Sequence, residues 1–424
     1  MGGVLGSREW RLRLWDGTEV APVGKSRFVI TLTRPRALDV LVGGTPERAF
    51  GRAYVAGDLD IEPLDPFLEC GARTSVVRVL KAWPGLVAAA VAMGARPRRG
   101  VAGDAEARLR GRAHSRQRDA AAVRHHYDLP PQFYALWLDE SMTYSCAYFE
   151  DPSAGIDAAQ RAKLDLICRK LRLRAGERLL DVGCGWGSLM LHAARHHGVG
   201  GVGITLSPRQ VEVARHRAAE LGLQDRVEFR LSDYRDIAER DYDAVASIGM
   251  IEHVSRSRLA TFTRAVHRAV RPGGRVLIHG ITCRPSARSR RLSFINTFVF
   301  PDGQLEDVGH VSSELEGAGL EVRDVENLRE HYVLTLQHWA RRLESNWDEA
   351  VSIAGVERAR VWRLYMTGAI AGFRTGAMSV HQTLAVRPTA AGRSGMPLLR
   401  DDWYPRTADT RGRTRAEVDG APTS

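Results

Sequence analysis

The middle of the chain alternates short apolar runs with stretches whose apolar residues recur at helical spacing. The run at 178–180 ends a predicted buried strand, and residues 189–194 fit the inner face of the helix that follows. Four further strands are predicted within residues 199–210, 226–237, 242–254 and 272–282, the last two each preceded by a helical stretch. Alternating strands and helices predict an α/β fold with a doubly wound, Rossmann-like sheet, in which ligands gather at the carboxyl ends of the strands.

A glycine-rich loop separates the first strand from its helix in the segment LLDVGCGWGSLMLHAA. Gly183, Gly185 and Gly187 lack side chains, so the backbone and the helix N-terminus can approach a ligand closely. A dinucleotide fingerprint requires glycine one position later, where the chain has Ser188. The G-x-G-x-G spacing after Asp181 instead resembles the first motif of class I S-adenosylmethionine methyltransferases.

Polar side chains follow the next two predicted strands. Thr205 stands where an acidic residue usually holds a ribose diol, so Gln210 is the nearest candidate to reach the ribose. Asp233 and Tyr234 supply an acid and a ring suited to an adenine amine and its face. These residues extend the predicted nucleotide-type site along the edge of the sheet.

The rest of the chain divides into regions of different composition. The first region alternates like a small sheet and predicts a separate α+β module, and an apolar helix with basic flanks and an arginine-rich exposed linker follow it. Beyond Pro388 little periodicity remains, which predicts a disordered tail. The predicted regions are an N-terminal module at 1–72, a basic helix and linker at 73–120, a methyltransferase domain at 121–388 and a tail at 389–424.

Composition narrows the class of protein without selecting one. A net charge of +11 suits an anionic partner, either nucleic acid or a membrane surface, and equally an ordinary solvated surface rich in arginine, so charge alone does not choose between them. Five cysteines without C-x-x-C spacing or paired histidines argue against a disulfide framework and a structural zinc site, so no metal is expected. The first residues lack a signal-peptide pattern, and the longest apolar run, at 85–95, is too short to span a bilayer. We therefore expect a cytoplasmic protein that attaches peripherally to the inner face of the membrane.

Seven motifs in the third region resemble the cyclopropane-fatty-acyl-phospholipid synthase family, including the mycolic acid cyclopropane synthases. They are HHYDLPPQFYALWLDESMTYSCAYF, LLDVGCGWG, GITLSPRQ, GMIEHV, HGIT, FVFPDGQL and HYVLTLQHWARRL, and the resemblance as a whole runs from His126 to about His381. The segment RAYVAGDLDI at 52–61 resembles, more loosely, the family's lipid-binding module. The resemblance implies methyl transfer from S-adenosylmethionine to the cis double bond of a phospholipid acyl chain, giving a cyclopropane.

The chemistry requires protection of a cation, because attack of an alkene on a sulfonium methyl leaves a carbocation in the acyl chain. Aromatic walls stabilise such a cation without being alkylated. The motif at 125–149 is dense in rings, namely Tyr127, Phe133, Tyr134, Trp137, Tyr144, Tyr148 and Phe149. In the family the base is a bound bicarbonate, which the resemblance assigns to Cys146, Glu252, His279 and Tyr332 with the amide of Ile281.

The same resemblance assigns the contacts to S-adenosylmethionine. They are Tyr144, Ser145, Asp181, Gly183, Cys184, Gly185, Gly187, Thr205, Leu206, Gln210, Asp233 and Tyr234. Tyr234 stands where many family members have tryptophan, which keeps a stacking ring. Arg235 follows Tyr234 in the same motif but stands where some members have glutamate, so its contact with the cofactor is left open.

Substrate contacts and product are left open. Arginines alternate with apolar residues over 284–304, which suits phosphates of an anionic membrane beside an acyl entry, although a solvated loop and a core helix give the same pattern. Actinobacterial relatives form a methylene-branched chain by a hydride shift before proton loss, and a flavin-dependent reductase partner then gives the 10-methyl branch. No motif distinguishes this product from the cyclopropane, and a homo-oligomer is neither predicted nor excluded.

Two other classes of function compete with this interpretation. An RNA or DNA methyltransferase would share the cofactor fold and the charge. However, the Asn- or Asp-Pro-Pro-aromatic clamp for base amines and a recognisable RNA-binding module are both missing, so no nucleic-acid partner is expected. A non-catalytic lipid carrier would suit the N-terminal module, but the intact set of residues assigned to bicarbonate disfavours it.

Overall fold

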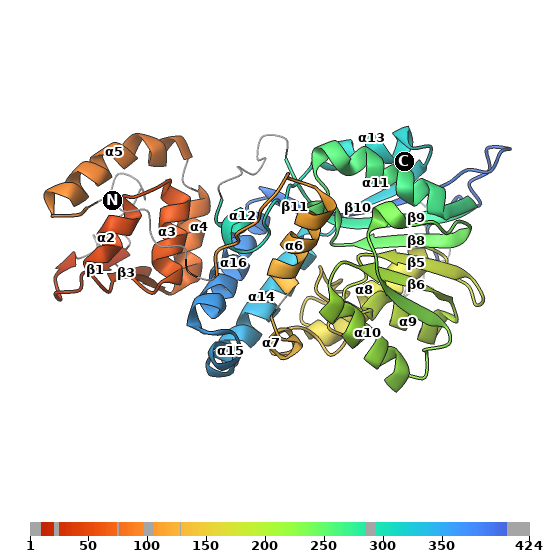
Figure 1. Ribbon diagram of the computed structural model, residues 1–424, viewed down its shortest axis with the longest axis horizontal. Helices are drawn as coiled ribbons and strands as arrows, with labels where there is room; N and C mark the ends of the chain where they lie inside the picture. The colour runs from red at the N-terminus through yellow and green to blue at the C-terminus, as the bar shows by residue number, and fades with distance from the viewer. Residues whose placement is uncertain are drawn as a thin grey trace, which may run out of the picture.

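The computed structural model describes residues 10–20, 25–73, 76–96, 103, 105–127, 129–284 and 293–404. The side chains of residues 72–80 are not described. Two sheets lie at opposite ends of an elongated molecule, with a group of helices between them (Figure 1). In this part of the chain no helix is both long and apolar enough to cross a membrane.

The larger sheet has seven strands in the order β10-β11-β9-β8-β5-β6-β7. Their bounds are β5 Arg178–Val182, β6 Gly200–Thr205, β7 Val227–Leu231, β8 Tyr242–Ile248, β9 Val270–Cys283, β10 Glu321–Asn327 and β11 Met378–Val386. Strands β5 to β9 pair in parallel, whereas β11 is antiparallel to both β9 and β10. The winding reverses between β5 and β8, so their carboxyl ends flank the point where open α/β sheets bind ligands.

Alternate residues of the parallel strands face two layers of helices. Leu179 packs with the cluster under α8 (Ile156–Lys170), α9 (Ser188–His197) and α10 (Pro208–Glu220). Leu180 packs with the cluster under α11 (Arg256–Ala269) and α13 (Val308–Gly317). Because both faces are covered, the strands read as nearly continuous apolar runs. The predicted Rossmann-like methyltransferase fold is confirmed.

One predicted element is wrong. The segment before β8 holds only a short 3-10 helix, η1 (Tyr234–Asp236), in place of the expected helical stretch. The residues between β7 and β8 are too few for an α-helix with a turn at each end.

The small sheet belongs to the N-terminal part of the chain. Strands β1 (Trp10–Arg13), β2 (Glu19–Val20), β3 (Phe28–Leu32) and β4 (Leu59–Glu62) are ordered β2-β1-β3-β4. Helices α2 (Arg36–Leu41), α3 (Pro46–Val55) and α4 (Leu64–Arg73) accompany this sheet, and α5 (Val76–Ala92) follows. Residues expected to form an α+β module therefore form one over 10–73, and we refer to it as the N-terminal module.

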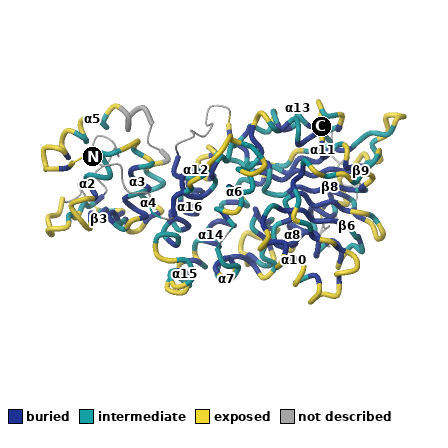
Figure 2. The backbone as a smooth tube through the Cα atoms, in the orientation of Figure 1, coloured by how far each residue is buried: buried dark blue, intermediate teal, exposed yellow. Residues whose placement is uncertain are grey.

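The remaining helices connect the two sheets. They are α6 (Arg116–Tyr127), α7 (Pro131–Ala135), α12 (Phe294–Phe298), α14 (Arg329–Ser345), α15 (Trp347–Ala354) and α16 (Val356–Arg374). Helix α16 is buried along much of its length, because it contacts the N-terminal module on one side and α14 on another (Figure 2). The Arg360 guanidinium donates to the carbonyls of Tyr54 at 2.7 Å and Leu59 at 2.8 Å, which ties the module to α16.

The expected exposed linker is partly buried. Ala105 and Glu106 are 1% and 6% exposed, and the Glu106 carboxylate accepts hydrogen bonds from Arg48 and Arg52 of α3. Helix α6 also begins at Arg116, before the expected end of the linker. The abundance of arginine in this segment suggested exposure. Its burial depends on the pairing of Glu106 with Arg48 and Arg52, which lie in the N-terminal module and are distant in sequence.

The predicted disordered tail is wrong for residues 389–404. Trp403 is 2% exposed in the cluster under α8, and its carbonyl accepts a 2.7 Å hydrogen bond from Arg169. The indole of Trp403 anchors this segment by itself, and one buried ring produces no periodic pattern of apolar residues in the sequence. Residues 405–424 lie outside the described part of the chain.

Candidate active site

The glycine loop follows β5 directly and leads into α9. Gly183, Gly185 and Gly187 all have positive φ, at 83°, 55° and 85°, which side chains disfavour. A Cβ on Gly185 would meet no atom within 4 Å, whereas one on Gly187 would lie 2.7 Å from Cζ of Phe229. Gly185 therefore leaves space open at the strand end, and Gly187 lets the loop pack on the sheet.

A first cavity lies over the carboxyl ends of β5 to β8, and we call it the cofactor cavity. Of the twelve residues assigned to the cofactor, eleven line it: Tyr144, Ser145, Asp181, Gly183, Cys184, Gly185, Thr205, Leu206, Gln210, Asp233 and Tyr234. Gly187 does not, and its contact with Phe229 explains why glycine is required there. The structure thus gathers residues from four strand ends around one space.

Two buried charges face each other in the cofactor cavity. Asp181 is 1% exposed, and its Oδ1 has no hydrogen-bond partner among the described residues. Burial raises the pKa of Asp181 to about 7 and lowers that of Lys163 to about 8. Lys163 donates a 2.9 Å hydrogen bond to Oγ of Ser145. A buried carboxylate oxygen without a protein partner fits a cationic group of a ligand.

The proposed ribose and adenine contacts are already engaged with protein groups. The Thr205 hydroxyl donates to Oε1 of Gln210 at 2.6 Å, so these two side chains hold each other at the cavity wall. Nε and Nη2 of Arg235 donate to the two oxygens of Asp233 at 2.7 and 2.6 Å. Arg235, whose contact the sequence left open, also lines the cavity.

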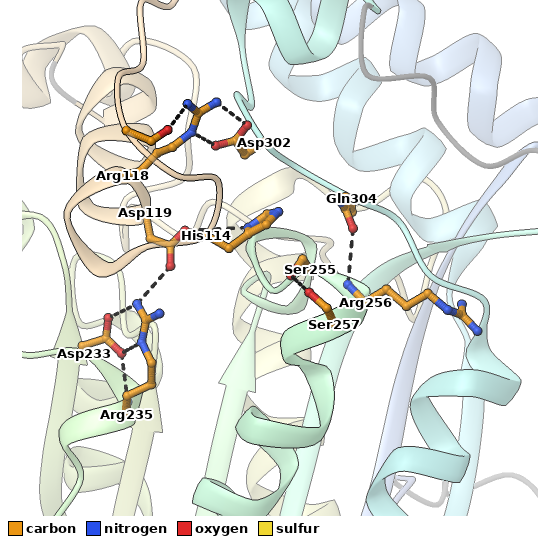
Figure 3. Close-up of polar contacts among 11 residues, drawn as sticks. His114, Arg118, Asp119, Asp233, Arg235, Ser255, Arg256, Ser257, Asp302 and Gln304 are labelled. Atoms are coloured by element: carbon orange, nitrogen blue, oxygen red, sulfur yellow. Dashed lines mark hydrogen bonds and ion pairs between the residues drawn. The ribbon is translucent and has the colours of Figure 1, made fainter.

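Helix α6 forms another wall of the cofactor cavity through Asp119, Ala122 and neighbouring residues. Nη2 of Arg235 donates to Asp119 at 2.9 Å, and Nη2 of Arg118 donates to Asp302 at 2.9 Å. Figure 3 shows these ion pairs reaching from α6 to the end of β7 and to the segment before α13. They hold α6 beside the cavity from two directions.

A second cavity of about 740 Å³, here the acyl cavity, adjoins the first. Both are lined by Tyr127, Tyr144, Ser145, Gly249 and His253. All five residues assigned to bicarbonate line the acyl cavity: Cys146, Glu252, His279, Ile281 and Tyr332. They come from separate segments of the chain, and the fold brings them to one space.

The backbone of β9 holds the side chain of Glu252, which lies just after β8. The backbone amide of Ile281 donates a 2.6 Å hydrogen bond to Oε1 of Glu252, while Oε2 is buried without a partner among the described residues. Burial raises the pKa of Glu252 to about 7. A Cβ on Gly280 would lie 2.4 Å from Ile251, so only glycine lets the two strand ends approach this closely.

The other three side chains assigned to bicarbonate are neutral donors. Nδ1 of His279 lies 3.3 Å from Nε2 of Gln382, an amide nitrogen that can only donate, so the imidazole proton belongs on Nε2. Burial lowers the pKa of His279 and raises the pKa of the Cys146 thiol and of the Tyr332 hydroxyl. Nε2 of His279 is buried without a partner in the part of the chain that the structure describes.

Only some of the predicted aromatic rings reach the acyl cavity. Tyr127 and Tyr144 line it, whereas Phe133 and Trp137 pack behind them with Trp362. The sequence did not identify Tyr365 or His253 as lining residues, whereas Phe300 belongs to the apolar residues expected to line an acyl entry. Phe300 and His253 lie in quoted motifs, FVFPDGQL and GMIEHV, but Tyr365 lies in a helix whose apolar pattern gives no sign of a cavity.

The N-terminal module completes the wall of the acyl cavity. Phe50 of α3 and Leu68 of α4 line it, and so does Glu47, whose carboxylate accepts a 3.0 Å hydrogen bond from the amide of Phe294. Phe294 opens helix α12, which also lines the cavity. Of the arginine-rich segment 284–304, residues 285–292 lie outside the described part of the chain, so its proposed contact with phosphates stays a prediction.

The chain is similar to proteins of known family. Residues 114–383 match the family described as mycolic acid cyclopropane synthetase. The chain is 38% identical over 400 residues to a probable fatty acid methyltransferase of Pseudomonas putida, covering 93% of this chain and 96% of that protein. It is 33% identical over 390 residues to a tuberculostearic acid methyltransferase of Mycobacterium tuberculosis, covering 89% and 87%.

A solved structure is similar to part of this chain. It is a mycolic acid cyclopropane synthase complexed with SAH and CTAB, at a TM-score of 0.60 and 34% identity. The match covers 63% of this chain and 97% of that one. The fatty acid methyltransferases named above therefore match this chain over more of its length than the mycolic acid synthase does.

Proposed function

The chain belongs to the mycolic acid cyclopropane synthetase family, and we propose that it transfers a methylene group from S-adenosylmethionine to the cis double bond of a phospholipid acyl chain. One observation carries the proposal: the cofactor cavity and the acyl cavity adjoin and share five lining residues. A methyl donor in one cavity would then meet an alkene in the other. The proposed product is a cyclopropane acyl chain.

The cofactor cavity fits S-adenosylmethionine in its chemistry. Asp181 offers a buried, unpartnered oxygen to a cationic group, and the space beside Gly185 is open to a ligand. Gln210 and Tyr234 provide an amide and a ring for ribose and adenine. When bound, S-adenosylmethionine supplies the electrophilic methyl group. Tyr144, Ser145 and Gly249 would lie between this group and the acyl cavity, since they line both spaces.

The hydrogen-bonding groups and the charge of the residues that line the acyl cavity fit bicarbonate. Cys146, His279 and Tyr332 are three neutral donors, and Glu252 adds one carboxylate with a buried free oxygen. Bicarbonate has acceptor oxygens for the donors and a hydroxyl that can donate to a carboxylate. Held there, bicarbonate supplies a base for the proton of the added methyl group. Ile281 would act indirectly, because its amide is committed to Glu252.

The apolar and aromatic walls suit an acyl chain that becomes cationic. Tyr127, Tyr144, Phe300 and Tyr365 present rings to the cavity, and rings attract a cation without reacting with it. Phe50 and Leu68 extend the apolar wall on the side of the N-terminal module. These walls also exclude water, which would otherwise capture the cation. The contribution of the module supports a fatty acyl substrate, since the matched fatty acid methyltransferase of Pseudomonas putida spans it as well.

A second product is supported by one comparison. A relative that spans 89% of this chain is named a tuberculostearic acid methyltransferase. A hydride shift in the same cation before proton loss would give an exocyclic methylene, and a flavin-dependent reductase partner would then be needed for the methyl branch. Both products come from the same residues, so the substrate and the site are proposed in common.

The membrane contact is proposed from charge. A net charge of +11 favours an anionic bilayer, and the substrate is a phospholipid, so we place the protein at the inner face of the membrane as a peripheral component. A homo-oligomer remains untested. A nucleic-acid substrate is disfavoured because the acyl cavity is walled by apolar and aromatic side chains.

The decisive experiment supplies labelled S-adenosylmethionine to purified protein with vesicles of dioleoylphosphatidylglycerol. Label is expected in the acyl chains, with none in vesicles of a saturated phosphatidylglycerol and none in added RNA. Ozonolysis then separates the products, because it cleaves an exocyclic methylene and leaves a cyclopropane intact. Label in RNA, or acyl binding without any transfer, would overturn the proposal in favour of a nucleic-acid methyltransferase or a lipid carrier.

A further inference from the structure

A group of metal-ligating side chains lies between α8 and α9, away from both cavities. Donor atoms of Cys168, His192 and His197 all lie within 4.8 Å of one another. Oδ1 of Asp165 lies 2.9 Å from Nε2 of His192 and 3.6 Å from Nε2 of His197. One carboxylate oxygen thus lies beside two imidazole nitrogens, which in turn lie close to a thiol.

The local sequence explains how the four residues meet. Asp165 and Cys168 are three residues apart in α8, so they project from the same face of the helix. His192 and His197 lie in α9, which ends at Gly198 in the left-handed conformation. The two helices contact each other on the same face of the sheet. The spacing of cysteines and histidines along the chain predicts no zinc site, because the ligands come from two helices.

The donor set and its geometry fit one kind of ion. A thiolate, two imidazoles and a carboxylate are the ligands that Zn²⁺ binds in tetrahedral sites, with bonds of about 2.0 to 2.3 Å. Nitrogen and oxygen ligands of such an ion lie about 3.3 Å apart. The two distances from Asp165, 2.9 and 3.6 Å, fall on either side of that value. Sγ of Cys168 lies within 4.8 Å of donor atoms of both imidazoles, so these side chains would have to draw together around an ion.

Burial also suits a site that holds an ion. Cys168 is fully buried, and the side chains of His192 and His197 are 10% and 22% exposed. Asp165, at 41%, opens the group to solvent on one side, which gives an ion a way in. We propose that Asp165, Cys168, His192 and His197 form a closed structural site for one Zn²⁺ ion or a similar borderline-soft divalent cation.

The site has a consequence for the cofactor cavity. Lys163 and Leu164 of α8 and Ser188 and Leu189 of α9 line that cavity, so a cation linking the two helices fixes the distance between two of its walls. The metal site does not depend on the proposed function, because its ligands take no part in the chemistry. Its loss is expected to lower the melting temperature and to weaken cofactor binding without abolishing it.

The test uses Co²⁺ as a spectroscopic substitute for Zn²⁺. Tag-free full-length protein is stripped with a chelator and titrated with Co²⁺ under reducing conditions. One equivalent is expected to give the intense visible bands of tetrahedral Co²⁺ and a thiolate charge-transfer band in the near ultraviolet, both removed by one equivalent of Zn²⁺. Cys168→Ser should remove the charge-transfer band, and His192→Gln should weaken Zn²⁺ binding by roughly 100-fold or more.

Two control variants isolate the site. Cys283→Ser removes another buried cysteine, and His216→Gln removes an exposed histidine that pairs with Glu220 at 3.3 Å in α10. Both should bind Co²⁺ as the unaltered protein does. Circular dichroism confirms that each variant is folded, and His197→Gln at the end of α9 provides a second ligand change. Absence of the charge-transfer band in the unaltered protein, or its persistence in folded Cys168→Ser, would overturn the proposal.

Discussion

The amide of Ile281 donates a 2.6 Å hydrogen bond to Oε1 of Glu252, a residue that lines the acyl cavity. One oxygen is thereby fixed by the backbone of β9, and the other, buried and without a partner among the described residues, is available to a ligand. This arrangement makes Glu252 the residue on which the proposed chemistry can be tested most directly.

Replacing Glu252 by glutamine should separate chemistry from cofactor binding. Glu252→Gln keeps an oxygen for the Ile281 amide but removes the charge that would accept the bicarbonate hydroxyl. Turnover is expected to fall on the order of a hundredfold, because a charge-assisted contact in a dry site is lost. Calorimetry should give near-normal affinity for S-adenosylmethionine. Tyr332→Phe is the milder comparison, and wild-type turnover by Glu252→Gln would refute the assignment.

The same variant should change stability with a defined pH dependence. Burial raises the pKa of Glu252 from 4.5 to about 7, so the folded state keeps a proton that the unfolded state loses. Stability is therefore lost as pH rises from about 4.5 to 7, by on the order of 3 kcal/mol. Glu252→Gln avoids this loss. It should unfold at about the same temperature as the parent at pH 4 and at a higher temperature at pH 8 in bicarbonate-free buffer.

Blocking the space beside Gly185 should abolish cofactor binding. Gly185→Val places a branched side chain where a Cβ meets no protein atom, in the space left for the ligand, on a backbone with φ of 55°. Gly222→Val is the matched control, because Gly222 has φ of 66° and equally open surroundings but does not line the cavity. Calorimetric affinity should be lost only in the first variant. An equal loss of affinity in both variants would show that backbone strain, not occupancy of the site, governs the result. Normal affinity in Gly185→Val would contradict the assignment of this loop to the cofactor.

Loosening α6 should speed release of the cofactor. Arg118→Met removes the ion pair with Asp302 that holds α6 beside the cofactor cavity. A pair of this kind contributes about 1 kcal/mol, so the dissociation rate should rise roughly fivefold. Stopped-flow displacement of a fluorescent analogue measures it. Arg161→Met, which breaks the exposed pair with Glu140, should leave the rate unchanged. A similar change in both variants would argue against a specific role for α6.

Binding to membranes should depend on lipid charge and on salt. The net charge of +11 predicts binding to phosphatidylglycerol vesicles that weakens as salt rises from about 0.05 to 0.5 M, because the attraction is a screened surface field. Phosphatidylcholine vesicles are the neutral control. Sedimentation of the vesicles measures the bound fraction. Equal partition onto both lipids at every ionic strength would contradict an electrostatic attachment.

The sequence by itself determined the parallel sheet and the position of its ligand edge. Because both faces of the sheet are buried, its strands appear in the sequence as nearly continuous apolar runs. The alternating order of strands and helices makes the strands parallel and brings their carboxyl ends to one edge. The glycine loop could be predicted because its positions need a positive φ and no side chain, which only glycine provides. Residues assigned through the motifs, such as Cys146 and Tyr332, follow from the resemblance and not from any spacing.

Tertiary structure alone decided which distant segments share a space. Phe50 and Leu68 reach the acyl cavity because the N-terminal module docks on α16, where Arg360 makes some of the contacts, and no local pattern in either segment encodes that docking. Trp403 is buried for the same reason, by docking under α8. Periodicity reports which face of an element is apolar. It does not report what packs against that face, because the packing partner is fixed by the summed burial of the whole chain.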